Sequence, residues 1–215
     1  MDEILKTIKL IEEQARELKV PWVTEESKAK DPYRVLISCI LSLRTKDKTT
    51  AQASQRLFKV ADDPGKMVRL PPPYLASIIY PVGFYRNKAK FILEISRKII
   101  QDFEGRVPNN LQSLLGLKGV GRKTANLVLG LGYNVDSICV DTHVHRISNR
   151  LGWVKTKSPH QTEQGLKAII PRRYWIRLNT ILVAFGQNIC MPVSPYCSKC
   201  SVRNLCRRNK VAKSR

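Results

Sequence analysis

The sequence predicts an all-α fold, and three observations support this prediction. Apolar residues recur at intervals of three and four along most of the chain, which is the spacing of one helical face. Alternation of apolar and polar residues between turn signals, the pattern of a half-buried strand, is hard to find. Acceptor side chains stand directly before prolines at several points, which is typical of a helix start. These signals predict about ten short helices with short connections.

The helices can be placed in chain order from their stripes and starts. The stripe of the N-terminal helix consists of Ile4, Leu5, Ile8, Ile11, Ala15 and Leu18. A second stripe lies at Val35, Leu36, Cys39, Ile40 and Leu43, and a third at Phe91, Ile92, Ile95, Ile99 and Ile100. Helices are predicted to start at Asp31, Asp63 and Ser158, because the side-chain oxygen of each residue can accept hydrogen bonds from the backbone N–H groups of the first turn. The proline that follows each of them has no N–H that would need a partner.

The charge of the chain indicates a polyanionic partner. The 215 residues include 38 Lys and Arg against 17 Asp and Glu, a formal charge of +21. Residues 164–215 hold 11 of the cations and no carboxylate. Such a segment would repel itself unless it met phosphates, so nucleic acid is the first expectation and an anionic membrane surface the second. With no secretory signal and no apolar run of spanning length, we expect a cytoplasmic protein that is not bound to a membrane.

Four cysteines near the C-terminus have the spacing of a metal-cluster loop. Cys190, Cys197, Cys200 and Cys206 are separated by six, two and five residues. Disulfides are rare in the cytosol, so clustered cysteines there more often bind a soft metal. Zinc is the competing metal, but its sites usually contain two Cys-x-x-Cys pairs, and this loop has one. The other two cysteines, Cys39 and Cys139, lie in apolar runs and are interpreted as small buried hydrophobic residues.

A glycine hairpin and a lone carboxylate are the candidate chemical site. Gly119 and Gly121 stand among Lys118, Arg122 and Lys123 at a predicted helix start, where backbone N–H groups can approach a phosphate. A plain turn between helices is the alternative interpretation. Asp141 follows the apolar run 138–140 and is the only carboxylate between Asp136 and Glu163. An N-cap is its ordinary role, but beside a lysine it would form a catalytic pair.

The hairpin, the segment Val140-Asp141-Thr142-His143 and the cysteine loop, in this order, resemble endonuclease III and related helix-hairpin-helix DNA glycosylases over nearly the whole chain. The resemblance implies an all-α, two-domain fold. Residues 22–134 would form a six-helix barrel domain. Residues 1–21 and 135–215 would form a cluster domain, with a 4Fe-4S cluster held in the loop 190–206 by Cys190, Cys197, Cys200 and Cys206. The substrate would be damaged double-stranded DNA, with the damaged base turned out of the stack.

The resemblance also implies roles for the candidate pair. Lys123 matches the family's nucleophile and Asp141 its essential carboxylate. A lysine that is partly desolvated at a helix N-terminus, beside Arg122, is expected to lose its proton more easily and to attack C1′ of the sugar. Asp141 could accept that proton or stabilise the positive charge on the sugar. The resulting imine would allow β-elimination, so the chain is expected to be a bifunctional DNA glycosylase and AP lyase for oxidised pyrimidines in base excision repair.

Further positions are expected to contact DNA. Phe84 matches the family's wedge and Arg44 a position that is often glutamine, with core packing and a solvated cation as their alternative interpretations. The other expected contacts are Lys118, Gly119, Gly121, Arg122, Lys199 and Arg203. The chain departs from the family in residues 191–196, which contain no Lys or Arg, so phosphate contacts would shift toward Lys199, Arg203, Arg207 and Arg208.

Two other functions remain open at this stage. The same scaffold could remove uracil or mismatched thymine, whereas adenine removal is disfavoured because those relatives lack the catalytic lysine. A non-catalytic iron-sulfur DNA-binding protein would need the basic surface and the cluster but neither Lys123 nor Asp141. In each case we expect a monomer associated with the nucleoid.

Overall fold

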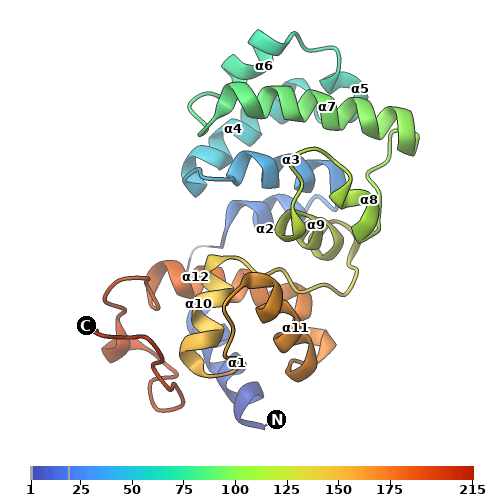
Figure 1. The fold of residues 1–215 in the computed structure, drawn as a ribbon. Helices are drawn as coiled ribbons and strands as arrows, with labels where there is room; N and C mark the ends of the chain where they lie inside the picture. The colour runs from blue at the N-terminus through green and yellow to red at the C-terminus, as the bar shows by residue number, and fades with distance from the viewer. Residues whose placement is uncertain (1, 19) are drawn as a thin grey trace. The chain divides into compact units, whose positions relative to one another are not determined.

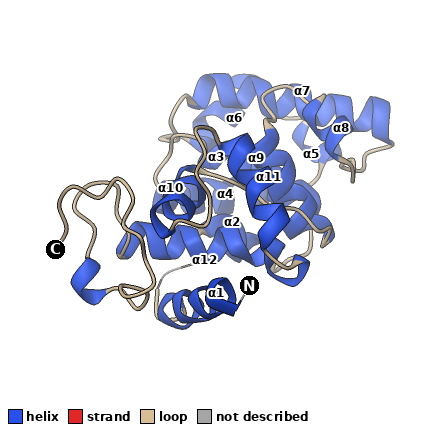
Figure 2. Cartoon of the chain, turned by 60° about the horizontal axis from the view of Figure 1, so that its bottom comes forward, coloured by secondary structure: helices blue, strands red, loops and turns tan. Residues whose placement is uncertain are grey.

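The computed structural model describes residues 2–18 and 20–215. All regular elements in these ranges are helical, which confirms the predicted fold class (Figures 1 and 2). The chain forms two compact units, Trp22–Val135 and a second made of Met1–Pro21 with Asp136–Arg215. The second unit therefore joins the N-terminal helix to the C-terminal part of the sequence.

The unit 22–135 is built from eight α-helices and one π-helical turn. They are α2 (Trp22–Ser27), α3 (Pro32–Ser42), α4 (Asp47–Val60), α5 (Pro64–Met67), α6 (Pro72–Ile79), α7 (Tyr85–Phe103), α8 (Leu111–Leu115), α9 (Arg122–Leu127) and η1 (Val128–Gly132). The predicted starts at Asp31 and Asp63 are confirmed, since Asp31 accepts from the backbone N–H of Tyr33 and Arg34, and Asp63 from that of Lys66.

Helix α3 is the centre of this unit. It contacts α2, α4, α7, α9 and η1. Its residues Val35, Leu36, Ile37 and Leu41 are each 0% exposed and point in different directions, so the helix is buried on nearly every side. A helix of this kind is stable when neighbours cover every side. Its C-terminal end therefore has to be closed by groups from elsewhere in the unit.

The second unit contains α1 (Asp2–Ala15), α10 (Thr142–Leu151), α11 (Pro159–Ile169), η2 (Arg172–Tyr174), α12 (Trp175–Asn188) and η3 (Cys197–Lys199). Ile8 and Ile11 of α1 share one core with residues of α10 and α12. Gly186 lets α12 approach α10 closely, because a Cβ there would lie 2.6 Å from His143 Nδ1. The predicted start at Ser158 is confirmed by its bond from Gln161 N–H.

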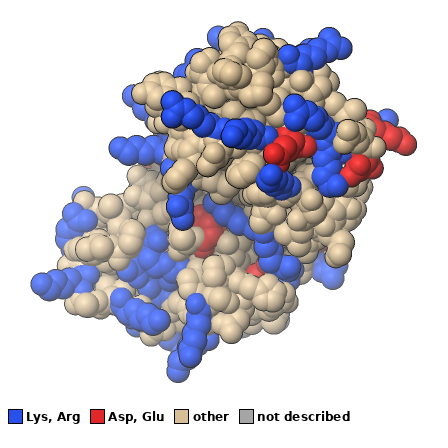
Figure 3. Space-filling model, turned by 45° about the horizontal axis from the view of Figure 1, so that its top comes forward, with Lys and Arg blue, Asp and Glu red and all other residues tan. Residues whose placement is uncertain are grey.

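Lys and Arg side chains are spread over the surface, and few Asp and Glu accompany them on the face seen in Figure 3. Within the described ranges, we find no helix long and apolar enough to cross a bilayer.

Candidate active site

The hairpin joins α8 to α9 and is held by apolar residues on both sides of its glycines. Leu117 and Val120 are 2% and 6% exposed. Gly119 has φ +76°, a left-handed conformation that side chains with a Cβ rarely adopt. Gly121 has φ −92° and would meet nothing within 4 Å if it carried a Cβ. The fold therefore requires glycine at position 119 but leaves open space beside position 121.

Lys123 lies in the first turn of α9 and is partly buried. Its ammonium group is near Cys39 of α3, where its charge favours the thiolate. Burial outweighs this effect and raises the pKa of the Cys39 thiol to about 12. Cys39 and Cys139 are 1% and 3% exposed, which confirms that they are buried small residues.

Lys118 does not stand free on the hairpin. Its Nζ lies 2.7 Å from a carboxylate oxygen of Glu94 on α7 and 5.6 Å from the centre of the Phe91 ring. Phe91 also lies under Gly119, with a ring carbon 3.5 Å from the position of a Cβ. Lys118 therefore ties the hairpin to α7.

Asp141 is the N-cap of α10. Its Oδ1 accepts from the backbone N–H of His143 and of Val144, each at 2.9 Å, so the ordinary interpretation of this residue is confirmed. The cap uses one oxygen of the carboxylate and holds the group in a fixed orientation. Lys123 belongs to the unit 22–135 and Asp141 to the other unit, so their pairing stays a prediction.

Arg44 and Phe84 lie together on two neighbouring loops. Phe84 is 60% exposed, which rules out core packing as its role. The Arg44 guanidinium lies 5.8 Å from the centre of the Phe84 ring. Both residues are left-handed, with φ 51° and 58°, a conformation that costs about 1–2 kcal/mol in a residue with a Cβ. Gly83 allows the loops to touch, because a Cβ there would lie 2.7 Å from Arg44 O.

A buried lysine, missed in the sequence, holds these two loops. Lys88 is 5% exposed, and its Nζ donates to Leu41 O at 2.8 Å, Leu43 O at 2.6 Å and Thr45 Oγ1 at 3.1 Å. Thr45 Oγ1 in turn accepts from Gly83 N–H. Burial lowers the pKa of Lys88 to about 8. The signal was present, since Lys88 precedes Ile92 by four positions and so lies on the apolar face of α7.

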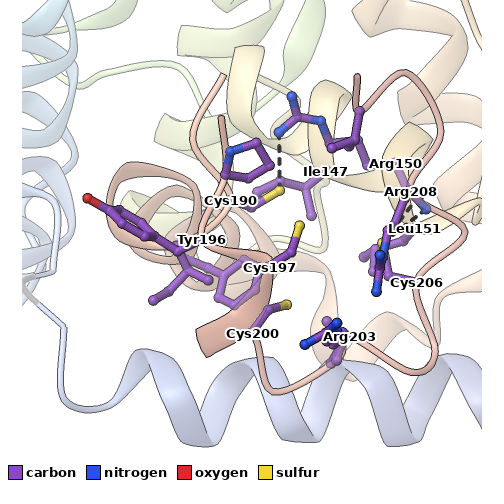
Figure 4. Close-up of a pocket in the computed structure, with 15 residues that line it drawn as sticks. Ile147, Arg150, Leu151, Cys190, Tyr196, Cys197, Cys200, Arg203, Cys206 and Arg208 are labelled. Carbon is purple, nitrogen blue, oxygen red and sulfur yellow. Dashed lines mark hydrogen bonds between the residues drawn. The ribbon is translucent and has the colours of Figure 1, made fainter. Parts of the chain in front are cut away.

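The four C-terminal cysteines line one cavity of the second unit (Figure 4). Apolar side chains, among them Ile147, Leu151, Phe185 and Val202, form most of the rest of its wall, and Arg150, Arg203 and Arg208 also line it. Burial raises the pKa of the Cys200 thiol to about 11 and also raises that of Cys206. Across the described part of the chain, no three His, Cys, Asp or Glu side chains are arranged around a point that suits a single metal ion.

Arg150 explains how the cation-free loop 191–196 is held. This arginine is 7% exposed and donates to Met191 O at 2.6 Å and to Pro192 O at 2.7 Å. It also donates to Cys190 Sγ at 3.4 Å. Lys199 and Arg203, predicted to contact DNA, are exposed on the same segment, and Arg203 also borders the cysteine cavity.

The chain has clear relatives among known proteins. Residues 37–172 match the HhH-GPD superfamily of base excision DNA repair proteins. The chain is 48% identical over 197 residues to endonuclease III of Thermotoga maritima, with 92% of each chain covered. A trapped endonuclease III–DNA covalent intermediate aligns with a TM-score of 0.85 at 31% identity, covering 97% of this chain and 96% of that one. A thermostable thymine-DNA glycosylase aligns with a TM-score of 0.83 at 25% identity, covering 95% of both chains.

The chain belongs to the HhH-GPD superfamily of base excision DNA repair proteins. This membership confirms the predicted resemblance to endonuclease III. It also confirms the predicted enzyme class, a DNA glycosylase with AP lyase activity that acts in base excision repair.

Proposed function

We propose that the chain removes oxidised pyrimidines from duplex DNA, acting as a monomer on nucleoid DNA in the cytoplasm, with Lys123 as nucleophile and Asp141 as its acid-base partner. The observation that carries the proposal is the hairpin, which leaves open space at Gly121 and places the partly buried Lys123 in the first turn of α9. Backbone N–H groups at such a helix start can bind a phosphate and so bring the sugar of one nucleotide close to Lys123.

The proposed reaction proceeds through a covalent intermediate. Lys123 Nζ, after losing a proton to Asp141, forms a bond to C1′ while the bond from C1′ to the base breaks. The departing base takes up a proton, and the C1′–O4′ bond then breaks while a proton moves from Nζ to O4′, so the opened sugar is an imine of Lys123. Loss of a C2′ proton moves electrons toward C3′, and the bond to the 3′ phosphate breaks. Water finally releases the lysine, so the overall reaction removes the base and cuts the strand.

Reduction with borohydride during incubation with a single-lesion duplex tests this role. The wild-type chain should form an adduct that survives denaturation, because reduction converts the imine to a stable amine. Lys123→Gln should form none. Lys90→Gln is the matched control, since it removes an exposed lysine of the same unit that has no proposed contact with DNA. If Lys123→Gln still gives an adduct, or if neither the wild type nor Lys90→Gln gives one, the proposal is wrong.

We infer that Arg44 and Phe84 occupy the gap left by the extruded base, and that Gly119, Gly121, Arg122, Lys199 and Arg203 contact the DNA backbone, with Lys118 contributing from its pair with Glu94. The exposure of Phe84 and its contact with Arg44 support the first part. Phosphate contacts of this kind position the protein without reading sequence. Base choice would then depend on Arg44, whose guanidinium offers donors where a glutamine offers a donor and an acceptor.

We propose that Cys190, Cys197, Cys200 and Cys206 hold a 4Fe-4S cluster. The residues fit such a group, because all four thiols line one apolar cavity and a four-iron cluster binds each thiolate through a different iron. A zinc ion would instead need four ligands around one point. The cluster would keep the C-terminal loop folded. Iron and sulfide analysis of purified protein tests this assignment, and stoichiometric zinc without iron would contradict it.

A second candidate, removal of mismatched thymine or uracil, is favoured by the similarity to the thymine-DNA glycosylase. A panel of short duplexes, each with one lesion, separates the two. Preference for oxidised pyrimidines supports the first proposal, and preference for thymine or uracil opposite guanine supports the second.

A further inference from the structure

A basic groove lies at the C-terminal end of α10, at the opposite end of this helix from Asp141, and includes Arg207, which the sequence predicted to contact phosphate. It is lined by Asn149, by residues 154–157 of the loop after α10, and by Arg207, Asn209 and Lys210 of the C-terminal tail. We call it the tail groove. Its volume is about 620 Å³. Asp141 caps the other end of α10, and ten helical residues place the two ends about 15 Å apart.

The tail groove is a folded feature and not a loose pair of surface segments. Asn149 bonds to both of its walls, since its Oδ1 accepts from Thr156 N–H at 2.9 Å and its carbonyl accepts from Asn209 Nδ2 at 3.0 Å. The backbone N–H of Asn209 also donates to Arg150 O at 3.2 Å. These bonds fix the two basic segments in one position relative to each other.

The backbone of the tail is also specifically shaped. Arg208 and Lys210 are both left-handed, with φ 52° and 58°. Such residues persist where surrounding contacts hold them. Gly152 makes room for the stem of Arg207, because a Cβ there would lie 2.3 Å from Arg207 Cδ. With the backbone in this conformation, Arg207 and Lys210 both line the groove.

The cations of the tail groove have no acidic partner within reach. Lys155, Lys157, Arg207 and Lys210 are exposed, and none forms an ion pair in the part of the chain that the structure describes. Glu163 is the single carboxylate in residues 142–215. It is 2% exposed and bonds to Lys167 at 2.7 Å. The groove therefore presents four cations, without an ion-pair partner among the described residues, to an anion from outside the chain.

The lining favours a phosphodiester backbone over an acidic protein. Protein interfaces are centred on aromatic and other apolar anchors, and Val154 is the one apolar side chain in the groove. Phosphates are bound by Lys, Arg, Asn and Thr donors, which make up the rest of the lining. Single strands are usually held by stacking on aromatic rings, and the lining contains none. Duplex DNA, bound through its backbone, fits these features.

We propose that the tail groove binds the backbone of a second segment of duplex DNA while the lesion-bearing segment occupies the active site. The inference rests on the proposed function in one respect: the tail groove is a second site because the proposed active site includes Asp141, at the other end of α10. A protein with two such sites could transfer between DNA segments without dissociating, which shortens the search for rare lesions. Binding would be independent of sequence and strongly dependent on salt.

Co-capture of two duplexes tests the proposal. A short duplex with an uncleavable abasic analogue is attached to beads and saturated with protein, and a fluorescent undamaged duplex is then titrated at several salt concentrations. The wild type should retain the fluorescent duplex at low salt. Lys155→Gln/Lys157→Gln/Lys210→Gln should lose this retention, because three phosphate contacts correspond to a salt slope of about 2.7. Arg207 is kept because its stem packs on Gly152.

The matched control is Lys6→Gln/Lys9→Gln/Arg16→Gln, which removes the same charge from exposed positions of the same unit. It should retain the second duplex nearly as well as wild type. Equal losses in both variants would show a general charge effect and overturn the proposal. Displacement by poly-glutamate at concentrations where undamaged duplex is ineffective would point to an acidic protein and also overturn it.

A single-turnover assay on a short lesion duplex separates this proposal from the proposed function. The groove variant should react at the wild-type rate, since it changes no residue of the proposed active site. Failure of borohydride trapping with intact co-capture would contradict the catalytic roles and leave the groove standing. Intact trapping without co-capture would contradict the groove alone.

Discussion

Replacing Lys88 with methionine should destabilise the unit 22–135 and loosen both loops that carry Arg44 and Phe84. Methionine keeps the length and the apolar contacts of the stem but has no donor. Leu41 O would lose its partner inside the core, which costs about 1–3 kcal/mol. Leu43 O and Thr45 Oγ1 are half-buried, so water can replace part of their bonds. The sum is a loss of about 2–4 kcal/mol at neutral pH.

The pH dependence of this loss is a sharper test than its size. Burial holds the folded-state pKa of Lys88 at about 8, against 10.5 in the unfolded chain. Between these values the unfolded chain binds more protons, so the stability of the wild type rises with pH relative to Lys88→Met. The difference between the two proteins should therefore be smallest below pH 8 and grow toward pH 10.5. Urea unfolding at pH 7 and pH 10 measures it.

Lys90→Met is the matched control for Lys88→Met, because Lys90 lies two residues further along α7 and is exposed. It should change the unfolding free energy by less than about 0.5 kcal/mol. The reasoning would be refuted if the two variants unfolded at the same urea concentration at both pH values. A glycosylase rate for Lys88→Met equal to that of wild type would show that the loops keep their positions without the lysine.

Two further substitutions separate chemistry from folding. Asp141→Asn keeps the N-cap, because an amide oxygen can accept the bonds from His143 and Val144. The free energy of unfolding should change by about 1 kcal/mol or less, while the single-turnover rate of base removal should fall about 10²–10⁴-fold. A rate near that of the wild type would exclude a catalytic carboxylate. The Cβ added by Gly121→Ala meets no atom of the protein, so the melting temperature should stay unchanged while binding to undamaged duplex DNA weakens. Binding at wild-type strength would show that the DNA backbone does not approach this glycine.

Local signals in the sequence were sufficient for the fold class and for much of the candidate site. Asp31, Asp63, Ser158 and Asp141 cap helices as expected, because a cap depends on residues two or three positions away. The cysteine spacing likewise indicated a shared site, and the four side chains line one cavity. The sequence also indicated a tight turn at Gly119, because a left-handed backbone conformation favours glycine whatever surrounds it.

Tertiary structure alone decided the contacts between segments that are distant in the sequence. The bonds from Lys88 to Leu41 and Leu43 cross more than forty positions, and those from Arg150 to Met191 and Pro192 span a similar distance. The apolar face of α7 indicates that Lys88 points inward, but the partners of Lys88 and Arg150 cannot be identified from the sequence, because they are carbonyl groups that every residue carries. The tail groove depends on the same kind of contact, since residues 149–157 and 207–210 meet only after folding.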